Sequence, residues 1–282
     1  MQTRTRVPRR LLALIVGVIV AMSLALTGCD STSTSKENTQ PSDDGLKLIA
    51  PGILTIGSDC DYPPFIELAG DQPAGFELEM MQAIGEHLGL EIEYLPPQNF
   101  DTILASVASG VVMDLGVSSF TITNERKELI DFCTPYFDSN QAVVALKSKG
   151  YASALDLDGK VVGAQSGTTG ADWVNENLRD PGTTLKEYNQ TSEALAAMMA
   201  GDIEAVFFDE PVAAEQVATT YTDAEIVESI ATGEQYGIAV SKDNPTLKDK
   251  INEALRAIKS NGSFDRIFTK YFPDLDPPTL TP

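Results

Sequence analysis

The sequence is poor in the residues that bind transition metals and nucleic acids. It has one histidine, His87, and three cysteines, Cys29, Cys60 and Cys133, which lie far apart in the chain. Because no histidines and cysteines cluster with the spacing of a zinc site, we expect no metal and no cofactor. Lysine and arginine total 20, against 41 aspartates and glutamates. So acidic a chain lacks the basic surface that phosphate binding needs, which excludes nucleic acid as an expected partner.

The composition is that of a globular protein. The chain has 282 residues, of which 43% are hydrophobic and 22% are charged. This length accommodates one or two domains. The net charge of −21 favours solubility and carries no functional signal of its own.

A targeting segment is predicted at residues 1–28. Its first residues are basic, and its apolar run from Leu11 to Leu26 is shorter than the ~20 residues of a membrane-spanning helix. The end of the run, Leu26-Thr27-Gly28-Cys29, resembles the bacterial lipobox, in which the cysteine is lipidated and becomes the first residue of the mature protein. The alternative is an N-terminal anchor that is never cleaved.

A flexible tether is predicted at residues 29–50. The stretch from Asp30 to Gly45 is rich in Ser, Thr, Asn, Asp and Gln, a composition typical of linkers. We therefore expect an exported protein whose body lies just outside the cytoplasmic membrane, in the periplasm or the extracellular space, held there by lipid on Cys29.

The remaining chain alternates short apolar strands with amphipathic helices, which predicts an α/β fold with mostly parallel sheets. Strands are expected at 53–58, 90–94, 111–117, 161–164 and 203–208, and helices at 80–88, 100–109, 171–178, 192–200, 247–259 and 263–271. Extended runs at 141–146 and 234–240 are expected to cross between two lobes. The predicted first lobe comprises residues 51–140 and 235–282, and the second comprises residues 141–234.

The segment from Ser118 to Arg126 has the features of an anion site. It follows a predicted strand, contains the hydroxyls of Ser118, Ser119 and Thr121, and leads into a helix for which Thr123 is a good N-cap. Arg126 falls in the first turn of that helix, beside free backbone N–H groups. A carboxylate suits this arrangement best, because arginine can hold it with two parallel hydrogen bonds. The alternative is a surface turn with a solvated arginine.

Several short motifs are each too common to identify a protein family, but their order and spacing along the chain are specific. They are Gly57-Ser58-Asp59, Tyr62-Pro63-Pro64-Phe65, Gly75-Phe76-Glu77-Leu78, Ile122-Thr123-Asn124-Glu125-Arg126, Ile130-Asp131-Phe132, Gly167-Thr168-Thr169, Asp209-Glu210 and Gly237-Ile238-Ala239-Val240. With this spacing, residues 50 to 275 resemble the amino-acid-binding solute-binding proteins of bacterial ABC importers, the polar amino acid group. The resemblance implies two α/β lobes that close over one ligand. It also implies delivery to a membrane permease by a protein that is not an enzyme, which we expect to be a monomer.

The resemblance implies contacts with the α-amino and α-carboxyl groups of a free amino acid. The ligand carboxylate would be gripped by Arg126, helped by Ser119, Thr121 and the backbone near Thr168 and Thr169. Asp209 would accept the α-ammonium group from the second lobe, together with the carbonyl or hydroxyl of Ser119.

The resemblance also implies contacts with the ligand side chain. Tyr62 and Phe100 would stack on it, with cation–π attraction if it is basic. Asp59 would face its distal end, and Gln165 would line the pocket from the second lobe. Asp59, with Asp61 close by, favours a basic or amide side chain such as that of Arg, Lys, His or Gln. Cystine and other polar amino acids remain open.

Each of these residues has a simpler interpretation as well. Tyr62 and Phe100 can be ordinary core residues, and Asp209 can be a helix cap before Pro211. The loop Gly167–Gly170 can be a helix-entry turn, and it lacks the lysine and the spacing of a phosphate-binding P-loop. Outside the cytoplasm Cys60 and Cys133 can pair as a disulfide or remain two buried thiols.

Three rival functions remain open. One is an enzyme of the same fold that dehydrates arogenate or prephenate, for which Asp59 and Glu210 are the available acids. Another is a sensor that presents its ligand to a receptor, and the last is a purely structural surface lipoprotein. Turnover of prephenate would identify the enzyme, and the absence of any amino-acid binding would identify the structural protein.

Overall fold

The computed structural model describes residues 46–280, which belong to one compact unit of the chain. The predicted signal segment, 1–28, and residues 29–45 of the predicted tether lie outside the described residues. Within residues 46–280, no helix is long and apolar enough to cross a membrane. Residues 46–50, the last of the predicted tether, already pack on the body: Leu46 and Leu48 touch the core, and the backbone N–H of Ile49 donates to Asp114 Oδ1 at 3.0 Å.

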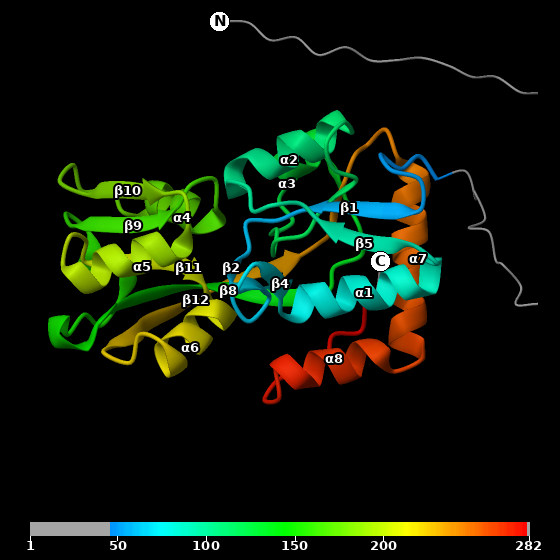
Figure 1. Ribbon diagram of the computed structural model, residues 1–282. Helices are drawn as coiled ribbons and strands as arrows, with labels where there is room; N and C mark the ends of the chain where they lie inside the picture. The colour runs from blue at the N-terminus through cyan, green and yellow to red at the C-terminus, as the bar shows by residue number, and fades with distance from the viewer. Residues whose placement is uncertain (1–45, 281–282) are drawn as a thin grey trace, which may run out of the picture. The chain divides into compact units, whose positions relative to one another are not determined.

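Two five-stranded sheets organise this unit (Figure 1). The first has the order β5-β1-β6-β13-β7, and the second has the order β10-β9-β11-β8-β12. The strands of the first sheet are β1 (Ile53–Gly57), β5 (Glu91–Tyr94), β6 (Leu115–Gly116), β7 (Asp131–Phe132) and β13 (Ala239–Val240). Those of the second sheet are β8 (Phe137–Leu146), β9 (Val161–Gln165), β10 (Thr184–Tyr188), β11 (Ala205–Asp209) and β12 (Ala224–Tyr236).

Both sheets are mixed. In the first, β1 pairs in parallel with β5 and β6, whereas β13 runs antiparallel to β6 and β7. In the second, β9 pairs in parallel with β10 and β11, whereas β8 runs antiparallel to β11 and β12. The predicted α/β class with two lobes is therefore confirmed, but the strands that cross between the lobes add antiparallel pairs. The residue boundaries of the lobes remain a prediction.

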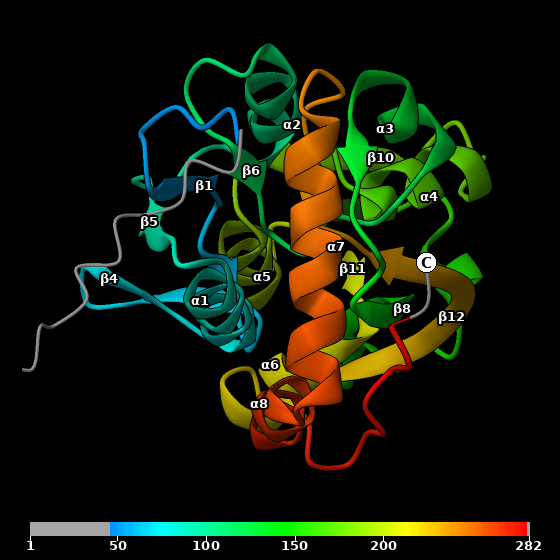
Figure 2. The same ribbon diagram turned by 90° about the vertical axis from the view of Figure 1, so that its right-hand side faces the viewer.

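Helices cover both sheets. They are α1 (Phe76–Leu88), α2 (Phe100–Ser109), α3 (Asn124–Leu129), α4 (Thr169–Asn177), α5 (Thr191–Ala200), α6 (Glu210–Thr219), α7 (Pro245–Ser260) and α8 (Ser263–Tyr271), with short 3-10 turns η1 (Lys147–Lys149) and η2 (Ala154–Leu157). In α7 the buried residues Leu247, Ile251, Leu255 and Ile258 recur at helical spacing, so one face of the helix packs inward. Figure 2 shows α7 in front, with α1 and α8 beside it.

The strand predicted at 111–117 is wrong in its first half. Val111 and Val112 are 71% and 54% exposed, and only Leu115 and Gly116 form β6. Asp114, just before β6, accepts with its carboxylate from the backbone N–H of Thr55 at 3.0 Å, and its own N–H donates to the carbonyl of Thr55 at 2.8 Å. An apolar run alone therefore overestimated this strand.

Another difference lies between β1 and α1. We predicted no strand there, but the chain forms an antiparallel three-stranded sheet of β2 (Asp61–Tyr62), β3 (Ile66–Ala69) and β4 (Gln72–Ala74). These strands are too short to produce a readable alternation of polar and apolar residues. Cys60 and Cys133 are both buried and free, so the two-thiol alternative describes this structure.

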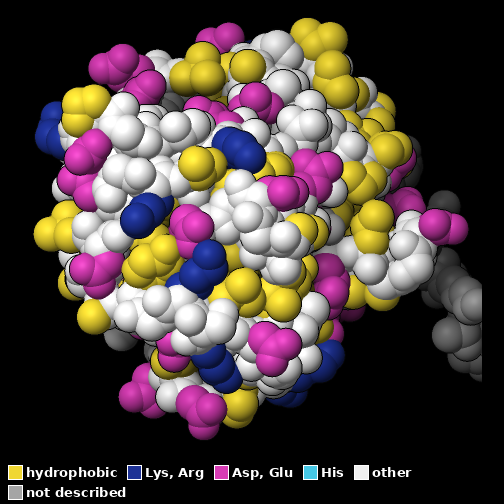
Figure 3. Space-filling view, turned by 90° about the vertical axis from the view of Figure 1, so that its left-hand side faces the viewer, with side chains coloured by type: hydrophobic (Ala, Val, Ile, Leu, Met, Phe, Trp, Pro, Cys, Tyr) yellow, Lys and Arg dark blue, Asp and Glu magenta, His cyan; other side chains and the backbone are white. Residues whose placement is uncertain are grey.

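The acidic charge is spread over the surface. On the face that Figure 3 shows, aspartates and glutamates are scattered among polar side chains and several lysines and arginines. This dispersal is in keeping with a general effect on solubility.

Candidate ligand-binding site

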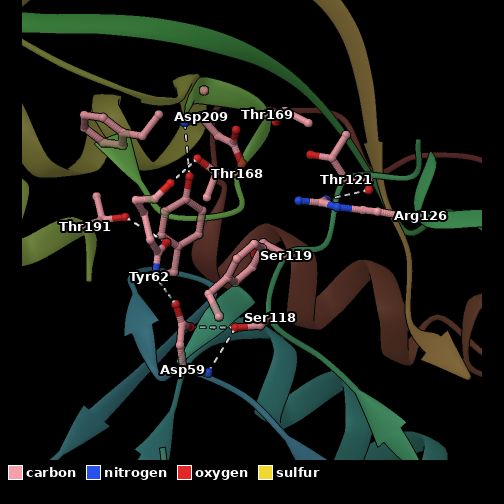
Figure 4. A pocket seen from close by; sticks show the side chains of 14 residues that line it. Asp59, Tyr62, Ser118, Ser119, Thr121, Arg126, Thr168, Thr169, Thr191 and Asp209 are labelled. Atoms are coloured by element: carbon pink, nitrogen blue, oxygen red, sulfur yellow. Dashed lines mark hydrogen bonds between the residues drawn. The ribbon is translucent and has the colours of Figure 1, made fainter. Parts of the chain in front are cut away.

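One narrow cavity brings together the residues singled out in the sequence (Figure 4). Its lining contains all eleven predicted ligand-binding residues, which are Asp59, Tyr62, Phe100, Ser118, Ser119, Thr121, Arg126, Gln165, Thr168, Thr169 and Asp209. Gly170, Thr191 and Phe208 line it as well, and we did not predict them. The position of these side chains is thus known, while their roles toward a ligand remain predictions.

The cavity lies where strands of both sheets end. Asp59 follows β1 and Ser118 follows β6 in the first sheet. Gln165 and Asp209 are the last residues of β9 and β11 in the second sheet. Because β1 and β6 are parallel, as are β9 and β11, the carboxyl ends of each pair meet at one edge, which is the usual ligand position in α/β sheets.

Arg126 is held rigidly at the entrance of α3. The predicted cap is present, since Thr123 Oγ1 accepts from the backbone N–H of Arg126 at 3.1 Å. The guanidinium donates from Nη1 to the carbonyl oxygen of Thr121 at 2.7 Å and from Nη2 to that of Gly167 at 2.9 Å. It also lies over the Phe100 ring, 5.5 Å from the centroid. Guanidinium N–H groups that these two bonds do not use remain for an anion.

Burial lowers the pKa of Arg126 from its ordinary value, while the charges of Asp209, Asp172 and Glu234 oppose that shift. Arginine stays protonated in proteins despite such shifts. The cavity therefore contains a fixed positive charge that carboxylates surround. Its bond to Gly167 also connects the first sheet's part of the chain to the second's.

Asp209 reaches the cavity from the end of β11. It stands at the N-cap position of α6, yet its side chain makes no capping bond. Instead Oδ1 accepts from the side-chain amide of Gln141, and Oδ2 accepts from the hydroxyl of Tyr236 at 2.5 Å. The carboxyl is 6% exposed. Burial, followed by repulsion from Glu234, raises the pKa of Asp209 to about 7.

Asp59 lies at another side of the cavity, beside Ser118 (Figure 4). Its Oδ1 accepts from the hydroxyl of Ser118 at 2.6 Å, and its Oδ2 accepts from the amide of Gln165 at 2.8 Å. Burial raises the pKa of Asp59, although both of these bonds lower it. The ion pairs found within residues 46–280 involve neither Asp59 nor Asp209. Both acids therefore face the cavity without a salt-bridge partner.

Six hydroxyl groups of the cavity, those of its serines and threonines, donate their protons to the protein. The pairs are Ser118 to Asp59 at 2.6 Å, Ser119 to Glu77 at 3.0 Å, Thr121 to Glu234 at 2.9 Å, Thr168 to the Gln165 carbonyl at 2.7 Å, Thr169 to Glu234 at 3.0 Å and Thr191 to Gln165 Oε1 at 3.2 Å. A hydroxyl has one proton and two lone pairs. In this arrangement the oxygens offer lone pairs to a ligand, although those of Ser118, Thr168 and Thr169 already accept one bond each from the protein. The cavity therefore suits a molecule with N–H donors.

Ser119 is supported from behind by Glu77. The backbone of Ser119 has φ +49°, a left-handed conformation that is unfavourable for residues other than glycine. Glu77 Oε1 accepts both from its N–H at 2.7 Å and from its hydroxyl at 3.0 Å, as well as from Tyr136. Glu77 is fully buried and its Oε2 has no partner within the described residues. Burial raises its pKa to about 7.

Direct bonds join the two lobes around the cavity. The backbone N–H of Asp209 donates to the hydroxyl of Tyr62 at 3.1 Å, and that of Ser192 donates to Asp61 Oδ2 at 2.9 Å. Together with the bond from Gln165 to Asp59, they enclose the cavity.

The sequence analysis assigned no role to three polar residues that lie behind the cavity lining. Glu77 is part of a motif that we quoted without assigning it a role, and the sequence does not distinguish it from the nearby Glu79. Gln141 and Glu234 lie on the crossing strands β8 and β12, and Gln141 donates to Glu234 Oε2 at 3.1 Å. Nothing local in the sequence distinguishes these two residues, because only the pairing of distant strands brings them together.

Fold and cavity together define a class of protein: a two-lobed binder of a small polar molecule. The sequence comparisons agree with this class. The family of bacterial extracellular solute-binding proteins, family 3, matches residues 54–274, so the chain belongs to that family. It is an extracellular amino-acid-binding protein of the kind associated with ABC transporters.

Individual relatives bind different amino acids. The arginine-binding extracellular protein ArtP of Bacillus subtilis (strain 168) is 29% identical over 260 residues, which cover 92% of this chain and 97% of ArtP. The L-cystine-binding protein TcyJ of Escherichia coli (strain K12) is 32% identical over 236 residues, which cover 82% of this chain and 87% of TcyJ. A solved structure of an ancestral arginine-binding protein bound to arginine is 37% identical, covers 78% of this chain and 98% of its own, and superimposes with a TM-score of 0.74.

Proposed function

We propose that this protein captures one free polar α-amino acid, with preference for a cationic side chain, and delivers it unchanged to an ABC importer. The observation that carries the proposal is the composition of the cavity, in which a fixed guanidinium and two unpaired, buried carboxyls, Asp209 and Asp59, face the same space. An α-amino acid offers a matching carboxylate and ammonium group.

The charges of the cavity support a cationic ligand. The carboxylate of the ligand would pair with Arg126 and its α-ammonium group with Asp209, which leaves the charge of Asp59 unmatched. A ligand with a neutral side chain would bury that charge without compensation, which costs free energy. An Arg, Lys or His side chain would compensate it, and the hydroxyl lone pairs favour a guanidinium or ammonium over an amide oxygen. The arginine bound by the relatives ArtP and the ancestral protein agrees with this choice.

The aromatic residues would complete the side-chain site. Tyr62 and Phe100 line the cavity and are almost fully buried. Phe100 is stacked on Phe120, with 4.7 Å between ring centroids, and it also underlies Arg126. We propose that Tyr62 offers the main apolar surface to the ligand side chain and that Phe100 mainly orients Arg126.

Capture would proceed by closure of the lobes. In our proposal the ligand first meets Arg126 and Ser119 in the open first lobe. The second lobe then brings Asp209 onto the α-ammonium group, and the bonds that cross the cavity form. Bound ligand stabilises the closed form because only that form makes both sets of contacts. The closed protein would dock on its permease.

We also propose that the protein is exported and lipid-anchored. The basis is the basic and apolar segment 1–28 followed by Cys29 in a lipobox-like sequence. A tether would keep the captured ligand near the permease and raise its effective concentration there. Replacement of Cys29 by serine should release the protein from membranes of the host, which cell fractionation would detect; equal membrane association of both forms would refute the anchor.

Thermal unfolding of the purified protein with each common amino acid tests the binding function. A ligand at ~100 times its dissociation constant adds about 2.7 kcal/mol, which should raise the midpoint by roughly 5–10 °C in a body of this size. We expect such a shift with L-arginine or L-lysine, and its loss in Arg126→Ala. Arg256→Ala, an exposed position on α7, is the matched control and should keep the shift. No shift with any amino acid would refute the proposal.

One observation supports an enzyme as the second candidate. A carboxyl whose pKa is about 7, as burial and Glu234 give Asp209, has the properties of a general acid near neutral pH. Incubation of the protein with prephenate and with arogenate separates the two functions. We expect both compounds to remain unchanged, whereas turnover that disappears in Asp209→Asn would establish the dehydratase.

A further inference from the structure

The most unusual feature near the cavity is a second carboxyl behind Asp209. Glu234 is half-buried on β12, just after a register shift in that strand between Ile230 and Glu234. It does not line the cavity, yet its Oε2 accepts from both lobes: from Thr121 at 2.9 Å and from Thr169 at 3.0 Å. None of the sequence motifs gave it a role.

Asp209 and Glu234 share one amide nitrogen. Gln141 Nε2 contacts Asp209 Oδ1, Glu234 Oε2 at 3.1 Å and Thr169 Oγ1 at 3.1 Å. An amide has two hydrogens, so one of these three oxygens always lacks a hydrogen from it. Gln141 Oε1 is buried without a partner within the described residues. Rotation of the amide by half a turn would let this oxygen accept from a protonated carboxyl.

The surroundings leave the pair with an excess of negative charge. The titratable groups that interact with the pair from the surrounding elements are Tyr62 on β2, Arg126 on α3 and Tyr236 on β12. The pKa values of Tyr62 and Tyr236 are raised well above the ordinary value by burial, so both rings are neutral. Arg126 is the only cation of this set.

We propose that Asp209, which shares an amide donor with Glu234, holds a proton when the lobes are closed without ligand and loses it to solvent when a ligand α-ammonium group binds. Only an O–H bond breaks, the proton passes to the buffer, and the ammonium group keeps its three protons. This inference rests on the proposed function, because it requires an ammonium group at Asp209. Amino-acid capture is then linked to pH through a residue that does not touch the ligand.

The direction of the linkage follows from burial and from the like charge of Glu234, which raise the pKa of Asp209 to about 7. Below that pH Asp209 in the closed, ligand-free form is protonated, and binding must expel the proton. We therefore expect release of about one proton per ligand at ~pH 6 and of almost none at ~pH 8. Affinity should fall about tenfold for each pH unit below ~7.

Calorimetric titration of the purified protein with L-arginine, in two buffers of different ionisation enthalpy, measures the released protons. Glu234→Gln removes the repulsion and should reduce the release at ~pH 6 to less than half and flatten the pH dependence of affinity. Glu225→Gln, at the other end of the same strand, is the matched control and should behave like the wild type. Equal release from Glu234→Gln and the wild type, or no release from the wild type, would overturn the pair.

Nuclear magnetic resonance provides a second readout. It is made on the wild-type protein alone and needs neither a ligand nor a variant. The side-chain carboxyl carbon of Asp209 in the wild-type protein should titrate with a midpoint near 7, and a midpoint near 4 would overturn the inference. If no amino acid binds at any pH, the proposed function fails instead. The two failures are thus distinguishable, since binding without proton release refutes only the pair.

Discussion

Glu77 destabilises the fold and at the same time supports the cavity through Ser119. Its carboxyl is fully buried and one of its oxygens has no partner, while the other holds Ser119 in a left-handed backbone conformation. A buried charge without a cationic partner destabilises the fold. We infer that this cost is tolerated because Ser119 must present its lone pairs to the cavity.

The pKa of Glu77, raised by burial from 4.5 to about 7, predicts how stability depends on pH. Between these two values the folded protein binds a proton that the unfolded chain has lost, so the free energy of unfolding falls as pH rises through this window. Across this window we expect the free energy of unfolding to decrease by about 3 kcal/mol less in Glu77→Gln than in the wild type. Urea denaturation at ~pH 4.5 and ~pH 8 measures it.

Glu79→Gln on the same helix is the control for that measurement. Glu79 is paired with Lys270 at the surface, and its pKa is lowered by hydrogen bonds to Lys270 and Tyr271. This group contributes stability above its unfolded pKa, in the opposite direction, so its removal should leave the wild-type fall in place. An unchanged fall in Glu77→Gln would contradict our account of the buried carboxyl.

At the scale of elements, α3 connects a helix cap to ligand recognition. The helix has six residues and no buried side chain, so its stability depends strongly on its ends. Thr123 caps it by accepting from the backbone N–H of Arg126, the residue that we propose grips the ligand.

Thr123→Ala should therefore reduce both stability and affinity. An N-cap contributes about 1 kcal/mol, and fraying of the first turn would displace Arg126 and weaken amino-acid binding several-fold. Thr123→Ser keeps the hydroxyl and should retain both properties. Urea denaturation and calorimetry on the two variants measure the effects. A loss in Thr123→Ser as large as that in Thr123→Ala would show that the cap is not the cause.

Elements also show what sequence patterns can and cannot predict. The helix at 263–271 was predicted with its observed ends, and the ends of α2 at Phe100 and Ser109 were also correct. Regular apolar spacing defines both helices locally, and glycine stands at the C-cap of α2 and at the N-cap of α8. The strand at 111–117 and the short strands after Asp59 were not predicted correctly. The conformation of these segments depends on hydrogen bonds that local apolar spacing does not reveal, such as that between Thr55 and Asp114 and the pairing of β2 with β3.

The cavity was predictable to the same extent. Residues such as Arg126 and Thr123 carry a local signal, and the other predicted lining residues followed from the order of motifs along the chain. The supporting Gln141 and Glu234 were not predictable, because they meet only after β8 and β12 have crossed between the lobes. Sequence reasoning therefore identified the residues that line the cavity and missed the polar residues behind them.

At the scale of the whole molecule, the account depends on two lobes that hold opposite ends of one α-amino acid. Arg126 belongs to the first lobe and Asp209 to the second, so neither lobe alone recognises both the carboxylate and the ammonium group. Bonds such as that from Asp209 to Tyr62 then form only when the lobes are together. We therefore propose that ligand binding and lobe closure are one event.

Calorimetric titration with L-arginine and with agmatine, which is arginine without its α-carboxylate, tests this claim most directly. We expect L-arginine to bind at one site per molecule and agmatine to bind at least ~100-fold more weakly, because a carboxylate paired with a guanidinium in a buried site contributes about 3 kcal/mol or more. The difference should vanish in Arg126→Ala. Equal affinity of the two compounds for the wild-type protein would contradict the account.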